Sequence, residues 1–305
     1  MAHDSPNQRA WQRFKRHRPA MVSLAFFLLL LALVLLWPIL SSSKPDAISD
    51  AQFQPPSAQH WCGTDVHGRD LLARIMFGAR ISLLVGAVGA GVSLVIGVTW
   101  GAVAGYIGGR LDGLMMRVVD VLYSLPSIVF VIVLITTLEE LVKAALPKGF
   151  GTQTGLSVRL LLVFAGLGAI SWLTMARIVR GQVLSLRTRS FVDASRALGA
   201  SHIHILWRHI LPNVYGIIIV YLTLTVPSII LYESFLSYLG LGIQPPMASW
   251  GSLIAEGADQ LNPIRVYWWL IVFPGVALVT ALLALNFLGD GLRDAYDPRA
   301  TSDRS

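Results

Sequence analysis

Long apolar stretches dominate this sequence and constrain its fold more than any other feature. A helix needs about 20 mostly apolar residues to cross the hydrocarbon core of a bilayer, and six stretches meet or approach this length: 21–40, 81–106, 118–138, 160–176, 214–236 and 267–288. Charged residues make up 13% of the chain, against about 25% in soluble domains. The sequence therefore predicts an all-α integral membrane protein with six transmembrane helices.

The first apolar stretch follows a basic N-terminus, as the core of a signal peptide would. It is longer than the usual apolar region of about 7 to 15 residues, so we expect it to remain as an anchor. The segment before it, Arg9 to Arg18, interleaves Trp11 and Phe14 with five cations. This composition suits a helix on an anionic leaflet, and a disordered basic tail that only orients the first span is an equal alternative.

The positions of Lys and Arg predict the orientation of the chain. If the N-terminus is cytoplasmic, six spans return the C-terminus to the same side, and 16 of the 24 Lys and Arg residues fall there. This bias agrees with the positive-inside rule. The net charge of +7 does not indicate nucleic-acid binding, because the cations flank apolar runs and form no single basic face. Cys62 is the only cysteine, so the sequence contains no disulfide pair of its own.

Small residues recur at every fourth position along the second stretch and just beyond it. In lipid, such a stripe lets another helix approach closely, and we expect tight packing there, within this chain or against a second subunit. The stripe consists of Gly89, Ser93, Gly97, Gly101, Gly105 and Gly109.

The segment between the fourth and fifth stretches, 187–213, is too charged to cross the membrane. It predicts a helix over Phe191 to Leu198, a break at Gly199 in the left-handed conformation, and a second helix that ends before Pro212. Ala194 and Ala197 are small, so another surface could approach them closely. Without further signals this pattern is weak, and in most proteins it would be an ordinary amphipathic connector.

The pattern of Asp193, Ala194, Ser195 and Gly199, closing on Leu211 and Pro212, resembles the Glu-Ala-Ala loop of bacterial ABC importer permeases. In that family the loop forms a coupling helix that docks in a cleft of the ATP-hydrolysing subunit. The resemblance implies that Asp193, Ala194, Ser195, Arg196, Gly199, His209 and Pro212 belong to the coupling site. Three of them depart from the family pattern: Asp193 replaces a glutamate, Ser195 an alanine, and His209 an apolar residue.

Further segments narrow the resemblance to the C-type permease of the oligopeptide, dipeptide and nickel branch. These segments are HWCGTDVHGRD (60–70), GARISLLVG (78–86), ISWLTMARIVRGQ (170–182), ESFLSYLGLGIQPPMASWG (233–251) and LGDGLRDAYDPR (288–299). The resemblance implies a type I ABC importer permease fold in a bacterial cytoplasmic membrane. Its implied partners are a homologous second permease subunit, two ATP-binding subunits that use ATP and magnesium, and an extracytoplasmic substrate-binding protein. This chain itself is expected to hold no cofactor.

The spans and the resemblance together divide the chain into four parts. Residues 1–20 are expected to form a basic cytoplasmic segment, and 21–79 the first transmembrane helix with an extracytoplasmic loop. Residues 80–295 would form the permease domain, with the coupling-helix loop at 187–213. Residues 296–305 would be a cytoplasmic tail.

Ionisable residues within spans are costly and are candidates for function. Asp120 follows Arg117 by three residues, so we expect a pair on one helix face, with a role in the transport path as the alternative. Glu233 lies near the outer end of the fifth stretch, where it could face the path, close a gate or cap the outer loop. Pro126 and Pro227 are expected to kink their helices.

Catalytic motifs do not occur in this sequence. It has no G-x-x-x-x-G-K-[ST] phosphate-binding loop, no H-E-x-x-H and no G-x-S-x-G. His202 and His204 lie in the charged loop and show no metal-ligand pattern beyond their own spacing. An enzyme is therefore a poor interpretation. A proton-coupled secondary transporter, a scaffold, or an importer of nickel or another small solute remain the alternatives to a peptide importer.

Overall fold

The computed structural model describes residues 6–41, 43–145, 154–245 and 247–296. These residues form helices and no β-strand, which confirms the predicted all-α fold. The tail predicted at 296–305 lies outside the described residues except for its first residue. The helices are α1 Pro6–Arg16, α2 Arg18–Leu40, α3 Leu71–Ile107, α4 Gly109–Ser124, α5 Ser127–Ala145, α6 Thr154–Leu186, α7 Ser190–Ala197, α8 His202–Ile205, a π-helical turn Leu206–Ile210, α9 Leu211–Tyr238, α10 Trp250–Asp259 and α11 Trp269–Tyr296.

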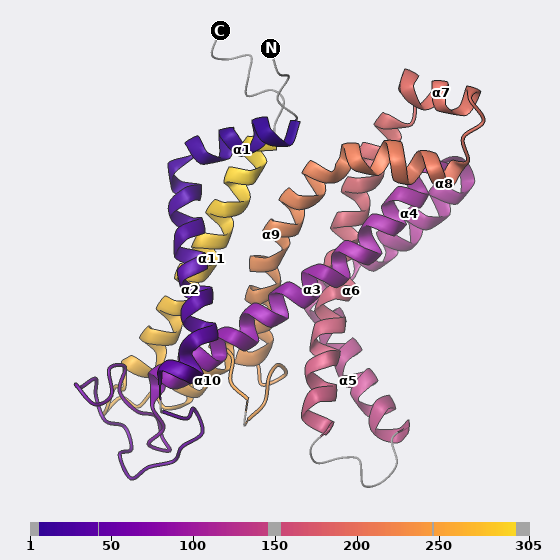
Figure 1. Ribbon diagram of the computed structural model, residues 1–305. Helices are drawn as coiled ribbons and strands as arrows, with labels where there is room; N and C mark the ends of the chain where they lie inside the picture. The colour runs from indigo at the N-terminus through magenta and orange to yellow at the C-terminus, as the bar shows by residue number, and fades with distance from the viewer. Residues whose placement is uncertain (1–5, 42, 146–153, 246, 297–305) are drawn as a thin grey trace.

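Four described helical runs are long and apolar enough to cross a membrane: α2, α3, the continuous run from α8 to α9, and α11. The bent pair of α4 and α5 makes a fifth if it counts as one span. By length and composition, the described residues thus contain four or five spans where the sequence predicted six. The remaining predicted stretch, 160–176, lies in α6, which also runs between the two ends of the bundle (Figure 1).

The third predicted stretch, 118–138, is two helices and not one. α4 and α5 meet at an angle of 94° across Leu125 and Pro126. Proline has no N–H for the helical ladder and disfavours helical geometry in the residue before it, so the expected kink becomes a break. Pro227 lies within α9, which continues across it.

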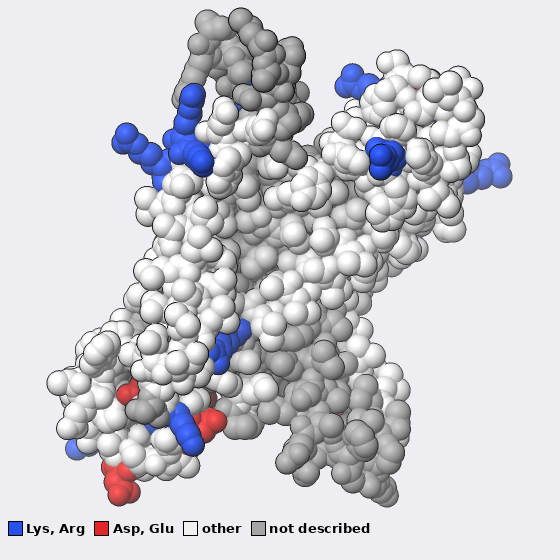
Figure 2. Space-filling view, in the orientation of Figure 1, with Lys and Arg blue, Asp and Glu red and all other residues white. Residues whose placement is uncertain are grey.

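Figure 1 shows α1, the C-terminal part of α11 and the short helices α7 and α8 at one end of the bundle, which we call the α7 end. The opposite end carries α10 and the loop 41–70, and we call it the α10 end. Lys and Arg side chains are more prominent at the α7 end and also appear near the α10 end, where the visible Asp and Glu side chains lie (Figure 2). The positive-inside rule expects this arrangement if the α7 end is cytoplasmic.

The N-terminal segment is a helix, α1, and its apolar side packs on the end of α11. Phe14 is 2% exposed and lies in one cluster with Ala295. Trp11, whose ring stacks on that of Phe14 with the centroids 5.7 Å apart, is 49% exposed. The alternative of a disordered basic tail is therefore wrong for Pro6–Arg16.

Helix α3 begins at Leu71, well before the predicted start at residue 81. The side chain of Asp70 caps it by accepting the N–H of Ala73 at 2.9 Å. Arginines near its start hid this part of the helix from a search for apolar runs. One of them, Arg80, donates to the carbonyl of Val34 at 2.8 Å. Pro38 has no N–H to offer that carbonyl, so Arg80 replaces the missing helical hydrogen bond.

The stripe of small residues lies on the side of α3 that packs against α9 and α6 of the same chain. A side chain at Gly89 would meet Ile229 of α9 at 3.0 Å, and one at Gly97 would lie 2.6 Å from Met175 Cβ of α6. Ser93, between them, is fully buried. The close neighbour that the stripe predicts is therefore inside this chain.

The same contact continues along α3 and stops before the last predicted member. A side chain at Gly105 would lie 2.8 Å from the carbonyl oxygen of Arg180, and Gly101 faces the α6 backbone. Gly109 follows the end of α3, has a φ of 62°, and has open space where a side chain would lie. Its inclusion in the stripe is wrong, because the chain turns at Gly108 and leaves the α3–α6 interface.

Buried ion pairs hold the α10 end together. Arg74 of α3 donates to both carboxylate oxygens of Glu256 in α10, at 2.6 and 2.9 Å, and to Asp65 of the loop at 2.8 Å. Arg69 also bonds Asp65, at 2.6 Å. Buried charges persist only when they are paired, so this cluster ties the loop, α3 and α10 into one unit.

Cys62 provides a test of which side of the membrane the α10 end faces. Burial, aided by the carboxylate of Asp70, raises the pKa of its thiol to about 11. Only the thiolate reacts with maleimides, so labelling by a membrane-impermeant maleimide should rise about tenfold per pH unit between pH 7 and 9. In spheroplasts this labelling should occur without opening the membrane.

A second cysteine supplies the control. In a Cys62→Ser background, a Ser190→Cys substitution at the α7 end should be labelled only after the membrane is permeabilised. The reverse pattern, with Cys62 protected in intact spheroplasts and position 190 labelled, would contradict the orientation.

Candidate functional site

The site that the sequence singled out is the exposed hairpin of two short helices at the α7 end (Figure 1). Helix α7 forms as predicted to within one residue at each boundary. Gly199 follows it with a φ of 80°, the left-handed conformation that glycine adopts without steric cost. The Ser201 side chain then accepts the N–H of His204 at 3.3 Å and begins α8. The helix, glycine and helix pattern is confirmed.

The second half of the prediction for this loop is wrong. The helix that starts at His202 does not end before Pro212 but continues through the π-helical turn Leu206–Ile210 into α9. Pro212 closely follows this turn, and a π-helical turn accommodates a change in the hydrogen-bond ladder such as the N–H that proline lacks. His209 lies in this π-helical turn, half-buried, with its ring 5.6 Å from that of His204.

Buried residues anchor the hairpin while its outer surface is open. Val192 and Ile205 are fully buried in a cluster with residues of α3, α6 and α9. In contrast, Leu198 is 88%, Ile203 74% and Trp207 64% exposed. Exposed apolar side chains of this size, grouped on a short rigid element, are typical of a protein-docking surface.

The charged residues of the predicted coupling site lie on the same exposed surface. Asp193 bonds Arg196 at 3.2 Å, and both side chains are largely exposed. Ser195 donates to the carbonyl of Phe191 at 2.9 Å, and Ala194 is exposed. A pair as open as this contributes little to stability, so both charges are available to a partner.

A groove of about 810 Å³ separates α7 and α8 from the end of α3. Tyr106 of α3 crosses it with a hydrogen bond of 3.0 Å to His202. Arg187 donates to the carbonyls of Gly105 and Tyr106, at 3.2 Å each. These carbonyls belong to the last turn of α3, where no helical N–H follows. The hairpin is therefore bonded to α3 through His202 and packed against α3, α6 and α9.

Two ion pairs link α4 to α6 beside this hairpin. Asp112 receives a bidentate bond from Arg180, at 2.5 and 2.6 Å. Asp120 pairs with Arg177 of α6 at 2.8 Å. The predicted Arg117–Asp120 pair on one helix face is therefore wrong: the partner of Asp120 comes from a neighbouring helix, whose proximity no spacing within α4 could reveal. The Arg177 guanidinium also stacks 4.0 Å from the centre of the Tyr123 ring.

Glu233 lies inside the bundle and is fully buried. Its carboxylate receives the hydroxyls of Ser237, at 2.6 Å, and Ser82, at 3.3 Å. The Ser82 hydroxyl also accepts the N–H of Trp250, and the Ser237 hydroxyl that of Ile243. Of the three alternatives for Glu233, this arrangement fits the capping of the outer loop, since the side chain holds that loop to α9 and α3.

Sequence reasoning missed two features of this site. The exposed apolar residues Leu198, Ile203 and Trp207 were overlooked, because apolar residues in a charged loop are usually explained by ordinary amphipathic packing. Arg187 and Arg180 were counted only as cations for orientation. The excess of arginine at the end of an apolar helix could have predicted the pairing of Arg180, because such a charge is stable only with a carboxylate nearby. In the described part of the chain, no three His, Cys, Asp or Glu side chains cluster as metal ligands would.

A bundle of long apolar helices, with two short exposed helices at its basic end, defines a multi-span membrane protein. Comparisons with known proteins agree. Residues 97–302 match the family of binding-protein-dependent transport system inner membrane components. Residues 5–56 match the N-terminal transmembrane domain of oligopeptide transport permease C.

Curated relatives cover nearly the whole chain. The oligopeptide transport system permease protein OppC of Escherichia coli K12 is 44% identical over 96% of this chain and 91% of its own length. The dipeptide transport system permease protein DppC of Bacillus subtilis is 43% identical, over 97% and 86%. In structure, the chain is similar to an inward-facing MetNI methionine ABC transporter chain, with a TM-score of 0.56 and 21% identity over 74% of this chain and 97% of that one. The chain belongs to the family of binding-protein-dependent transport permeases, in the OppC branch of ABC importers.

Proposed function

We propose that this chain is one permease subunit of a bacterial importer that carries peptides across the cytoplasmic membrane, driven by ATP hydrolysis in partner subunits. The observation that carries this proposal is the exposed α7–Gly199–α8 hairpin, which is anchored by Val192 and Ile205 and open on its outer surface. Relatives over nearly the whole chain are named for oligopeptide and dipeptide transport. Both point to a peptide importer whose motor docks at the α7 end.

The partners follow from this placement. Two ATP-binding subunits, which use ATP and magnesium, would dock below the α7 end, one of them on α7. A homologous second permease would complete the path, and a substrate-binding protein would deliver peptides at the α10 end. The α10 end suits that role, because the Arg74 cluster holds its loop rigid.

The mechanism would be alternating access driven through the hairpin. When the motor subunits close on ATP, they would move α7, and the buried anchors would pass this movement to α6 and α9. The bonds from Arg187 and His202 would carry it to α3. The permeases would thereby open alternately to either side.

Gly199 provides a test of this coupling. Valine at a φ of 80° costs about 1–2 kcal/mol, and nothing lies within 4 Å of the added Cβ, so the strain acts on the turn alone. Gly199→Val should lower ATP-dependent peptide uptake about tenfold, the equivalent of that strain, at nearly normal abundance in the membrane.

Two variants control for this result. Gly199→Asn should retain more uptake, because asparagine tolerates the left-handed conformation better. Gly181→Val places the same side chain at a helical glycine of α6 that also has open space around it, and uptake should change little. Normal uptake by Gly199→Val would refute the coupling role.

A further inference from the structure

A second cavity, of about 280 Å³, lies between the α4–α5 break, α6 and α9. Eight of its 13 lining residues carry a hydroxyl group, and none of the 13 is charged. Such a concentration of hydroxyls is unexpected in a bundle this apolar, where polar groups are placed at a cost. Two of the eight, Tyr123 and Thr174, bond each other across α4 and α6 at 3.1 Å, and the coupling site accounts for none of them.

The hydroxyls form continuous faces on two helices. Along α9, Tyr221, Thr225, Ser228 and Tyr232 follow one another at spacings of three and four residues, which places them on one side. Ser171 and Thr174 do the same on α6, and the break after Ser124 brings Ser127, at the start of α5, to the wall.

Three of these hydroxyls are biased towards accepting hydrogen bonds. Thr225 donates to the carbonyl of Tyr221 at 2.6 Å, Ser228 to that of Leu224 at 3.1 Å, and Ser171 to that of Leu167 at 3.1 Å. A hydroxyl has one proton and two lone pairs. With the proton committed to its own helix, each oxygen is left with acceptor capacity on the cavity side.

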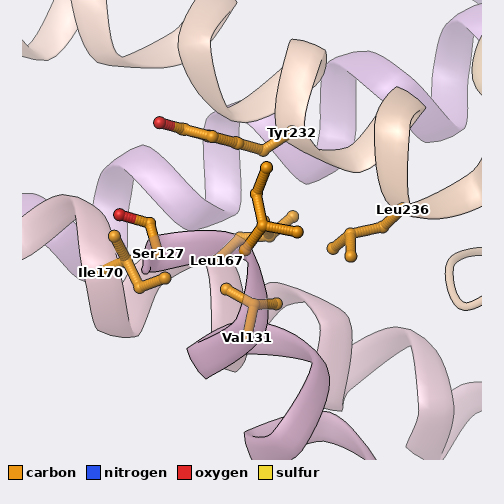
Figure 3. A pocket seen from close by; sticks show the side chains of 7 residues that line it. Ser127, Val131, Leu167, Ile170, Tyr232 and Leu236 are labelled. Atoms are coloured by element: carbon orange, nitrogen blue, oxygen red, sulfur yellow. The ribbon is translucent and has the colours of Figure 1, made fainter. Parts of the chain in front are cut away.

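A narrow apolar pocket adjoins the cavity. Figure 3 shows the smaller pocket beside the cavity, with the hydroxyl groups of Ser127 and Tyr232 pointing in the same direction and Val131, Leu167 and Leu236 among its lining residues. The space among them is about 10 Å³, about enough for one water molecule. The hydroxyl-lined cavity therefore shares Ser127, Ile170 and Tyr232 with a narrow apolar pocket, as a section of a gated path would.

We infer that this hydroxyl-lined cavity is a binding subsite of the transport path that accepts hydrogen bonds from the backbone N–H groups of a peptide. The inference rests on the proposed function and adds residues to it. Backbone N–H groups are common to all peptides, and an uncharged, acceptor-rich wall binds them whatever the side chains are. A wall carrying fixed charges would instead select among peptides by charge.

The test includes a control threonine on the same helix. Thr225 and Thr223 both lie on α9, and each donates to the carbonyl four residues before it, but only Thr225 lines the cavity. The complete transporter in proteoliposomes would take up trialanine, or trialanine methylated on its backbone nitrogens, with the same binding protein throughout. Thr225→Val with Ser228→Ala should slow trialanine uptake about three- to tenfold, as expected for one or two lost hydrogen bonds, while peptide-stimulated ATP hydrolysis persists.

The methylated peptide distinguishes the loss of hydrogen bonds to the peptide from a structural effect of the substitutions. Methylation removes the donors, so it should slow uptake by the parent transporter more than by the Thr225→Val, Ser228→Ala variant. The Thr223→Val control should behave as the parent in both assays. An unchanged methylation effect in the double variant would overturn the subsite, as would loss of the second permease from the purified complex, which would mean that the cavity packs a partner helix. If the parent complex takes up no peptide with ATP, the proposed function itself fails, and that result is distinct from both.

Discussion

Gly101→Ala is expected to destabilise the folded protein, and Gly101→Leu to remove most of it from the membrane. Gly101 lies where α3 crosses α6, and an added Cβ would meet the carbonyl oxygen of Ala176 and approach the backbone nitrogen of Arg180 to 3.0 Å. Backbone atoms cannot rotate away as a side chain can, so the two helices must separate. Overpacking of this kind costs roughly 1–3 kcal/mol, and in lipid the close approach of the backbones is itself the main source of helix association.

Gly91 provides the matched control, because it lies on the same helix with nothing within 4 Å of an added Cβ. Gly91→Ala should leave thermal stability in detergent unchanged or slightly raised, since alanine favours the helix over glycine. The measurement is the unfolding temperature of the purified complex for both variants. Equal stability of Gly91→Ala and Gly101→Ala would show that α3 and α6 do not meet as described.

The sequence predicted the helices that are apolar and missed the parts where charge interrupts them. The first turns of α3 were lost because Arg74 and Arg80 break the apolar run. Their partners, Glu256 and the carbonyl of Val34, lie far away in the chain. Spacing along one helix cannot reveal such partners, and the wrong partner for Asp120 has the same origin.

Glycine positions in the sequence predicted both close helix packing and a turn. The stripe in α3 predicted a close neighbour, and Gly199 predicted a turn, because each follows from the absence of a side chain. The identity of the neighbour depended on tertiary structure, as did the end of the stripe before Gly109. The π-helical turn before Pro212 could not be predicted, because the sequence does not distinguish a proline that ends a helix from one that follows a π-helical turn.

The sequence contains the spacing of the cavity's hydroxyl residues but does not show that they line one cavity. Tyr221, Thr225, Ser228 and Tyr232 keep a helical spacing that an inspection for charged residues passes over. Their meaning emerges only when α6 and the α4–α5 break face them. Uncharged polar stripes in apolar helices are therefore worth the same attention as intramembrane carboxylates.

The central claim, that this chain is the permease of an ATP-driven peptide importer, is tested most directly by peptide uptake into proteoliposomes. The chain reconstituted alone should neither hydrolyse ATP nor take up trialanine. With its second permease, both ATPases and the binding protein, it should take up trialanine only when ATP is supplied to the α7 side. Asp193→Lys should weaken peptide-stimulated hydrolysis, because it reverses an exposed charge on the docking surface. Uptake by the chain alone, driven by a proton gradient without nucleotide, would contradict the account and identify a secondary transporter.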